Sequence, residues 1–159
     1  MGSNTSAGAD TQAVLDAVRR IVHALRASSR RAEKHVGISG AQLFVLQKLD
    51  DSPAMSLNEL AARTHTHQSS VSVVVTRLVD RGLVERSRSK VDARSIRLSL
   101  TARGKRLMSR APDLAQERLI TGIQSLATAR RRMLASTLTE LAHAIDAAER
   151  VPAMFFEEG

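Results

Sequence analysis

The sequence contains no cysteine, and this absence excludes several kinds of site. A chain without cysteine has no disulfide framework, no thiol redox switch and no cysteine-ligated zinc. Histidine remains a possible ligand, but His65 and His67 are two residues apart, a spacing that does not put both imidazoles on one helix face. His23, His35 and His143 would have to converge between helices to bind a metal ion. We therefore expect neither a metal nor another cofactor.

Long apolar runs and common catalytic motifs are also missing. No window approaches the roughly 18 uncharged apolar residues that span a bilayer. Residues 1–10, MGSNTSAGAD, are small and polar, and we expect a disordered tail that is neither a signal peptide nor an anchor. These features predict a cytoplasmic protein with no membrane partner. The chain has no glycine-rich phosphate loop, nucleophile elbow or HExxH motif, so we do not expect an enzyme.

The charge of the chain is concentrated in one segment. The 159 residues carry 24 Lys and Arg against 16 Asp and Glu, a net charge of +8. Residues 77–110 hold 11 basic and 3 acidic side chains, whereas the rest of the chain is balanced with 13 of each. A basic segment of this kind most often meets nucleic acid, although anionic lipid also attracts one. With 43% hydrophobic residues, the chain is long enough to bury one core.

Apolar stripes near both ends predict long helices. The first helix is expected from Thr11 to Lys34, followed by Gly37, and the last from about Leu126 to Glu149. The stripe of the first helix is Val14, Val18, Ile21 and Leu25, and that of the last is Leu134, Leu138, Leu141 and Ile145. The 4, 3, 4 spacing in the last helix is typical of a helix that packs on another helix.

Two capped helices follow the first. Ser39 is the expected cap of a helix whose inward face is Leu43, Phe44, Leu46 and Leu49. The segment from Ser56 to Glu59 has the spacing of a capping box and begins a short third helix. This helix should stop near Thr64, because the residues that follow are poor helix formers.

The segment from Val71 to Thr76 allows two interpretations. Its β-branched residues favour a strand on propensity alone. Against this, Val71, Val74, Val75 and Leu78 recur at the spacing of one helix face. We predict a helix that ends at Gly82, which is suited to a left-handed cap.

A basic hairpin is predicted after this helix. Leu83–Ser87 and the alternating segment Ser95–Leu100 are the expected strands, and residues 88–94 form the loop between them. Thr101 is the expected cap of a helix that continues past Leu119 with a kink at Pro112. The C-terminal residues 151–159 are expected to be a tail, in which Phe155 and Phe156 are candidates to dock.

The order helix, turn, helix and hairpin is typical of a DNA-binding protein. In a helix-turn-helix, the second helix lies in the major groove and presents its outer face to base edges. Glutamine can pair with adenine, hydroxyl groups can bind bases or phosphates, and valine can contact a thymine methyl group. The candidate residues on the recognition helix are Gln68, Ser69, Ser70, Ser72, Val73, Thr76 and Arg77, and those on the wing are Arg86, Arg88, Lys90, Asp92 and Arg94.

Several of these segments together resemble the MarR family of bacterial winged helix-turn-helix regulators. The resemblance covers about residues 11 to 150 and rests on a few short motifs. These are Leu60-Ala61, Val71-Ser72, Leu78, Arg81-Gly82-Leu83-Val84-Glu85-Arg86, Asp92-Ala93-Arg94 and Leu98-Ser99-Leu100-Thr101 with Gly104. Where the family often has glycine in the turn, this chain has His65, and Ala93 stands where a second basic residue is common.

The resemblance implies a homodimer formed by the terminal helices, with a winged unit in each copy. It also implies that Arg94 enters the minor groove while Asp92 holds it in position. Relatives bind small, often aromatic, acids or drugs between the two parts, which implies a small-molecule effector. Its identity and its binding residues do not follow from the sequence.

The prediction is a mainly α protein with a small two-stranded β wing. Residues 39–103 form the winged helix-turn-helix DNA-binding domain, and residues 11–36 and 104–150 form the helical dimerisation region. The expected function is a homodimeric transcriptional regulator, more often a repressor in such a family, which binds a pseudo-palindromic operator and is released by an effector. The alternative is a nonspecific basic nucleic-acid-binding or architectural protein.

Overall fold

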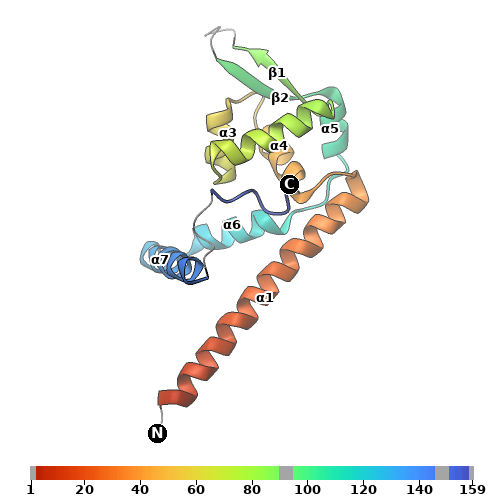
Figure 1. Ribbon diagram of the computed structural model, residues 1–159. Helices are drawn as coiled ribbons and strands as arrows, with labels where there is room; N and C mark the ends of the chain where they lie inside the picture. Colours follow the sequence, from red (N-terminus) through yellow and green to blue (C-terminus); the bar gives the residue numbers. More distant parts are fainter. Residues whose placement is uncertain (1–2, 90–94, 146–150, 158–159) are drawn as a thin grey trace.

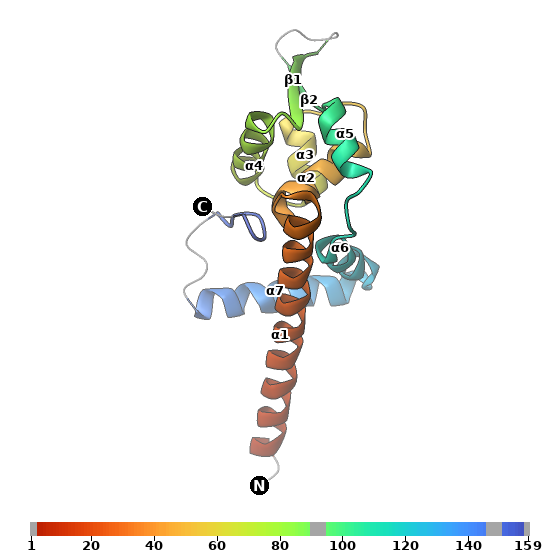
Figure 2. The ribbon, with the colours of Figure 1, turned by 90° about the vertical axis from the view of Figure 1, so that its right-hand side faces the viewer.

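The computed structural model describes residues 3–89, 95–145 and 151–157. Within these residues the chain forms seven helices and one two-stranded antiparallel sheet, which confirms the predicted fold class (Figure 1). The elements are α1 (Ser3–Val36), α2 (Gly40–Asp50), α3 (Leu57–Thr64), α4 (Gln68–Asp80), β1 (Val84–Arg88), β2 (Ile96–Leu100), α5 (Ala102–Met108), α6 (Ala115–Ser125) and α7 (Thr128–Ala144). Figures 1 and 2 show α2 to α5 and the hairpin gathered at one end of the long helix α1.

The predicted caps begin the second and third helices. The Ser39 hydroxyl accepts from the Gln42 backbone N–H at 3.2 Å, and the Ser56 hydroxyl accepts from Glu59 at the same distance. In both cases the side chain three residues on accepts from the cap's own N–H, which completes a capping box. Helix α3 ends at Thr64, as predicted.

The first helix begins earlier than expected. Helix α1 starts at Ser3, so the disordered tail predicted for residues 1–10 is wrong over its described part. Ala7 and Ala9 are strong helix formers, and the Thr11 hydroxyl donates to the Ala7 carbonyl at 2.8 Å. A helix already nucleated extends at little cost, because each added residue closes one more backbone hydrogen bond.

The single helix predicted from Thr101 past Leu119 is also wrong. Helix α5 ends at Met108, and a loop separates it from α6. Pro112 lacks the N–H that a helix needs, and its ring clashes with the carbonyl four residues earlier, which is that of Met108. Because α5 contacts α2 and β2, its residues lie with the winged unit and not with the helices expected to dimerise.

A hydrophobic core lies beneath α4 and the hairpin. Helix α2 is its centre, because it contacts α1, α3, α4, α5 and β2. The four apolar residues predicted to face inward on α2 are all buried. Strands β1 and β2 pair with Arg86 opposite Leu98, and Met55 adds a short bridge to Leu98.

Polar contacts join the start of helix α6 to both α1 and the winged unit. The Ala115 backbone N–H at its start donates to the Ser28 hydroxyl of α1 at 2.9 Å. Lys48 of α2 lies 2.6 Å from the Glu117 carboxylate. These contacts join α6 to both α1 and α2.

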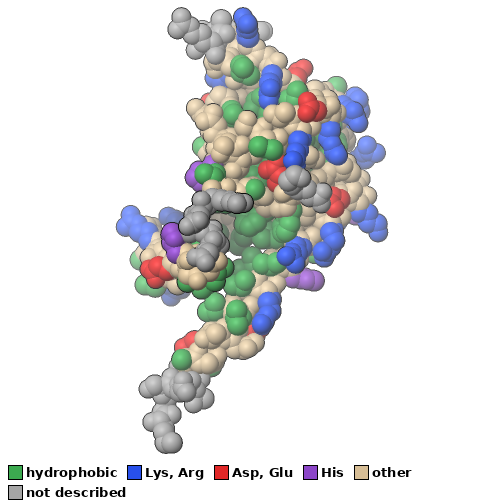
Figure 3. All heavy atoms as spheres, in the orientation of Figure 1, with side chains coloured by type: hydrophobic (Ala, Val, Ile, Leu, Met, Phe, Trp, Pro, Cys, Tyr) green, Lys and Arg blue, Asp and Glu red, His purple; other side chains and the backbone are tan. Residues whose placement is uncertain are grey.

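Apolar side chains are left exposed on α1 and α7. Helix α7 buries none of its residues. On α1 the exposed set is Val14, Leu15, Val18, Ile21 and Val22, and on α7 it is Met133, Leu134, Leu138 and Leu141, followed by Ile145. Figure 3 shows hydrophobic side chains along this lower part of the molecule. Across the described residues, no helix is both long and apolar enough to cross a membrane.

Gly104 allows α5 to approach the backbone just before β1 closely. A Cβ atom there would lie 2.2 Å from the Leu83 carbonyl oxygen, a contact with backbone that cannot move aside easily. We expect Gly104→Ala to lower the free energy of unfolding by about 1–3 kcal/mol or more. Gly122→Ala in α6 is the matched control, because nothing lies within 4 Å of its Cβ position. This control should gain about 0.5–1 kcal/mol. Urea unfolding measures both, and equal effects would contradict the close packing.

Candidate nucleic-acid interface

Helix α4 has one buried face and one exposed face. Val71, Val74, Val75 and Leu78 are all buried in the core, which confirms the predicted helix and excludes the strand. Their β-branched character favours a strand locally, but burial of the whole valine face against α2 and α3 outweighs that propensity. The opposite face is therefore directed outward.

The exposed face of α4 is small, polar and nearly uncharged. Gln68, Ser69, Val73 and Thr76 are exposed, and Ser72 is half-buried. Val73 exposes 47% of its surface although its valine neighbours are buried. We name these five residues the reading face.

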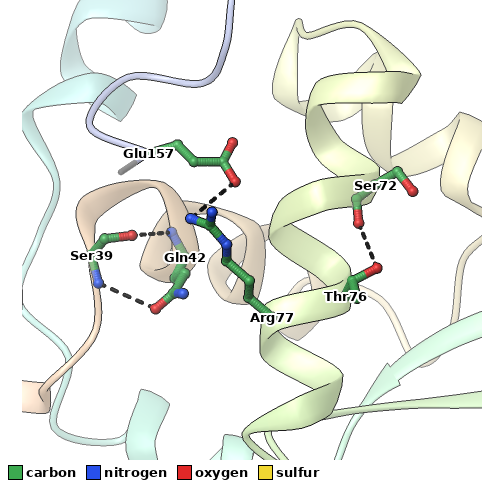
Figure 4. Close-up of polar contacts among 6 residues, drawn as sticks. All are labelled: Ser39, Gln42, Ser72, Thr76, Arg77 and Glu157. Atoms are coloured by element: carbon green, nitrogen blue, oxygen red, sulfur yellow. Dashed lines mark hydrogen bonds and ion pairs between the residues drawn. The ribbon is translucent and has the colours of Figure 1, made fainter. Parts of the chain in front are cut away.

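Thr76 connects the reading face to the wing. Its hydroxyl donates to the Ser72 carbonyl at 3.0 Å and accepts from the Arg86 guanidinium of β1 at 3.2 Å. The contact with Ser72 is drawn in Figure 4. The Arg86 cation is thereby held beside the reading face.

The turn before α4 is tight. His65 adopts a left-handed conformation with φ of 51°, which histidine tolerates better than most residues do. The Thr64 hydroxyl donates to the Leu60 and Ala61 carbonyls, and Ala61 is 8% exposed within the core cluster. A ring nitrogen of His65 also lies 3.2 Å from the Gln124 amide of α6.

Two predicted residues on α4 point away from the reading face. Ser70 is buried, and its hydroxyl donates to the Pro152 carbonyl at 2.8 Å, so its expected exposure to DNA is wrong. Arg77 lies 3.6 Å from the Glu157 carboxylate. Figure 4 shows Arg77 reaching Glu157 on one side of α4, with Ser72 and Thr76 on the other. Helix periodicity places Ser70 near the boundary between the two faces, but it does not predict that the C-terminal segment packs against this residue.

The wing has an exposed basic strand. Arg86 and Arg88 of β1, two of the predicted wing residues, are exposed. Met55 and Leu98 exchange two backbone hydrogen bonds, of 3.0 and 2.7 Å, which attach the hairpin to the segment that leads into α3. The remaining predicted wing residues, Lys90, Asp92 and Arg94, lie outside the described residues.

An ion pair missed by sequence reasoning also holds the wing. One carboxylate oxygen of Glu59 accepts from the Ser56 N–H and from Arg97 of β2, both at 2.6 Å. The Ser56 backbone N–H, followed by the Ser56 hydroxyl and Arg97, lowers the pKa of Glu59. The capping box was visible in the sequence, but its partner 38 residues away was not.

A cleft separates α4 from the end of α1. Its volume is about 510 Å³, and Arg77 and Arg81 line one side. Glu33 and Gln42 are among the residues on the other side. The Arg81 guanidinium also donates to the Gly37 carbonyl at 2.9 Å, which ties the end of α4 to the end of α1.

No group of three or more His, Asp or Glu side chains in the described part of the chain could hold a metal ion.

Comparison with known proteins assigns this chain to a family. Residues 38–96 match the model of the MarR family. The uncharacterised HTH-type transcriptional regulator ML2140 of Mycobacterium leprae (strain TN) is 30% identical over 130 residues, which cover 82% of this chain and 88% of the relative. The chain therefore belongs to the MarR family, whose members are winged helix-turn-helix transcriptional regulators.

Two solved structures share the fold. A mutant of MarR from E. coli, complexed with operator DNA, has a TM-score of 0.53 at 21% identity, over 80% of this chain and 92% of that one. Bordetella bronchiseptica BpsR, whose DNA binding is regulated by 6-hydroxynicotinic acid, has a TM-score of 0.55 at 24% identity, over 83% and 91%.

The lowered pKa of Glu59 predicts a pH-dependent contribution to stability. A carboxyl group with a lower pKa in the folded state stabilises the fold above its ordinary pKa, and this contribution is lost as the pH falls through the folded-state value. Glu59→Gln keeps a capping side chain but removes the charge, so we expect a lower melting temperature than wild type at about pH 7 and a deficit that shrinks as the pH falls below the ordinary pKa of glutamate. Glu140→Gln on α7 is the control, with little change expected at either pH. A deficit that persists at low pH would contradict the role of the Glu59 charge.

Proposed function

We propose that the protein binds double-stranded DNA in a sequence-specific manner, with α4 in the major groove. The observation that carries this proposal is the division of α4 into a buried valine face and an exposed reading face bordered by Arg86. Uncharged side chains such as Gln68 and Val73 can distinguish base edges, whereas arginines beside them bind phosphates at any sequence. The operator complex of the MarR mutant supports the same use of the fold.

The wing supplies the second group of DNA contacts in this proposal. Arg88 is exposed on β1 and suits a phosphate contact. Arg94 enters the minor groove with Asp92 as its brace, as the family resemblance implies. The contacts of Met55 and Glu59 with β2 support a fixed wing, because each joins the hairpin to the helix-turn-helix.

A second copy of this chain covers the exposed apolar faces of α1 and α7. Val14 is 51% exposed and Leu138 is 48% exposed, although both belong to regular apolar stripes. Such continuous apolar faces are typical of surfaces that another subunit buries. A two-fold dimer would bind a pseudo-palindromic operator whose half-sites are about 10 bp apart.

A small-molecule effector controls binding in this proposal, and the regulator acts as a repressor. The cleft between α1 and α4 has the volume of a small-molecule site and is bordered by Arg77 and Arg81. A ligand in this cleft would contact both α4 and the end of α1. It would therefore change the separation between the α4 helices of the two copies. The regulation of BpsR by 6-hydroxynicotinic acid supports an effector of this general kind.

Base reading and phosphate binding predict different mutant behaviour. Gln68→Ala should lose about 1–3 kcal/mol of discrimination at one base pair, because a bidentate contact with adenine is removed. Arg88→Ala, the matched control, should weaken binding to all sequences alike and reduce the salt slope by about one. Fluorescence-anisotropy titrations against an operator and its single-base variants measure both.

The same titrations separate the proposal from its alternative. Equal loss on every sequence for Gln68→Ala would contradict base reading by α4. Wild-type binding that is equal on operator and random duplexes would instead favour a nonspecific basic architectural protein.

A further inference from the structure

The C-terminal segment, residues 151–157, contacts α4 at two points, and both points lie away from the reading face. Pro152 accepts from the Ser70 hydroxyl near the start of α4, and Glu157 lies against Arg77, two turns further on. Between these contacts, Met154 is 4% exposed and belongs to the hydrophobic core. The segment is therefore docked on the molecule at three successive positions.

The same segment reaches the helices below α4. Phe156 lies with Leu25 of α1, Leu114 and Gln116 around a small cavity at the junction of the winged unit and α6. Figure 1 shows the segment between α4 and α6, and Figure 2 shows it directly below α4. It thus bridges the helix that carries the reading face and the helices below it.

From these contacts we propose that residues 151–157 form an intramolecular latch that withholds Arg77 from the DNA backbone. The inference rests on the proposed binding of DNA by α4. Because Ser72 and Thr76 lie on the other side of the helix from Glu157, the docked segment leaves the reading face uncovered (Figure 4). The segment holds the Arg77 cation at the edge of that face. Release of the latch therefore adds a phosphate contact and leaves the sequence preference unchanged.

Three features of the docked segment favour a reversible latch over a permanent support. The Glu157 side chain is 7% exposed, and its Oε1 atom accepts no hydrogen bond from the described residues, since 3.6 Å to Arg77 is too long for one. Burial raises the pKa of Glu157, and the Arg77 charge only partly opposes this effect. Phe156 has a φ of 58°, a left-handed conformation that is strained for a bulky side chain.

Phosphate is a strong competitor for the Arg77 guanidinium. A DNA backbone offers charged oxygens that can accept paired hydrogen bonds from arginine. Within the described residues, the latch offers the Glu157 carboxylate at ion-pair distance, in a site that penalises its charge. Contact with DNA therefore favours the released segment, and the docked segment opposes contact with DNA.

Removal of the Glu157 charge tests the latch. Glu157→Gln should bind an operator more tightly than wild type, with a salt slope steeper by about one and an unchanged order of preference among operator variants. The gain in affinity should be about threefold larger at 50 mM than at 200 mM salt, as one added phosphate contact requires. Arg77→Gln should abolish the gain, so that the double variant and Arg77→Gln bind equally.

A charge control is available on α7. Glu140→Gln removes the same charge far from α4, and its affinity should stay close to that of wild type. A gain equal to that of Glu157→Gln would assign the effect to net charge alone and overturn the latch. A loss of both affinity and melting temperature in Glu157→Gln would make the segment a structural support, which also overturns it.

A second readout follows the segment without DNA. The chain has no tryptophan, and Phe155 is 51% exposed, so Phe155→Trp introduces a single indole with little disturbance. Its fluorescence anisotropy should fall when Glu157→Gln is added and when operator DNA binds. Unchanged anisotropy in both cases overturns the latch. If the anisotropy reports docking but wild type binds no DNA duplex, the proposed function fails while the intramolecular contact stands.

Discussion

The burial of the valine face of α4 against α2 is the packing interaction on which the interface depends. Val71, Val74 and Val75 are essentially inaccessible to solvent, so α4 can present only its other face. Rotation of the helix would expose these side chains at about 1.5–3 kcal/mol each. The direction of the reading face is therefore fixed by the core, and the exposed residues are free to carry base contacts without supporting the fold.

Connections at the edges of α4 determine what surrounds that face. The wing is held by the strand-like contact of Met55 and by the Glu59–Arg97 ion pair, while Thr76 keeps Arg86 beside the helix. The end of α4 is tied to α1, and the start of α6 donates to α1. Movement of α1 relative to α6 would therefore be transmitted to α4, which is the coupling that an effector-controlled regulator requires.

Local signals in the sequence predicted most of the winged unit, whereas contacts between distant segments were missed. The capping boxes, the valine spacing and Gly82 act within a few residues, so the elements from α2 to β2 could be placed in advance. The burial of Ser70 depends on Pro152, 82 residues away, and no periodicity encodes that contact. The apolar pattern continues on both sides of Pro112, so the sequence predicts a kink within one helix. The backbone cannot continue as a helix through the proline, and the chain forms two helices instead.

In the proposed function, two copies of this chain read a symmetric operator through α4. Selection of bound sequences from fragmented genomic DNA, followed by footprinting with the purified protein, tests it most directly. We expect two protected half-sites related by two-fold symmetry, about 10 bp apart, with a shared sequence in each. Protection without symmetry, or without any preferred sequence, would contradict it.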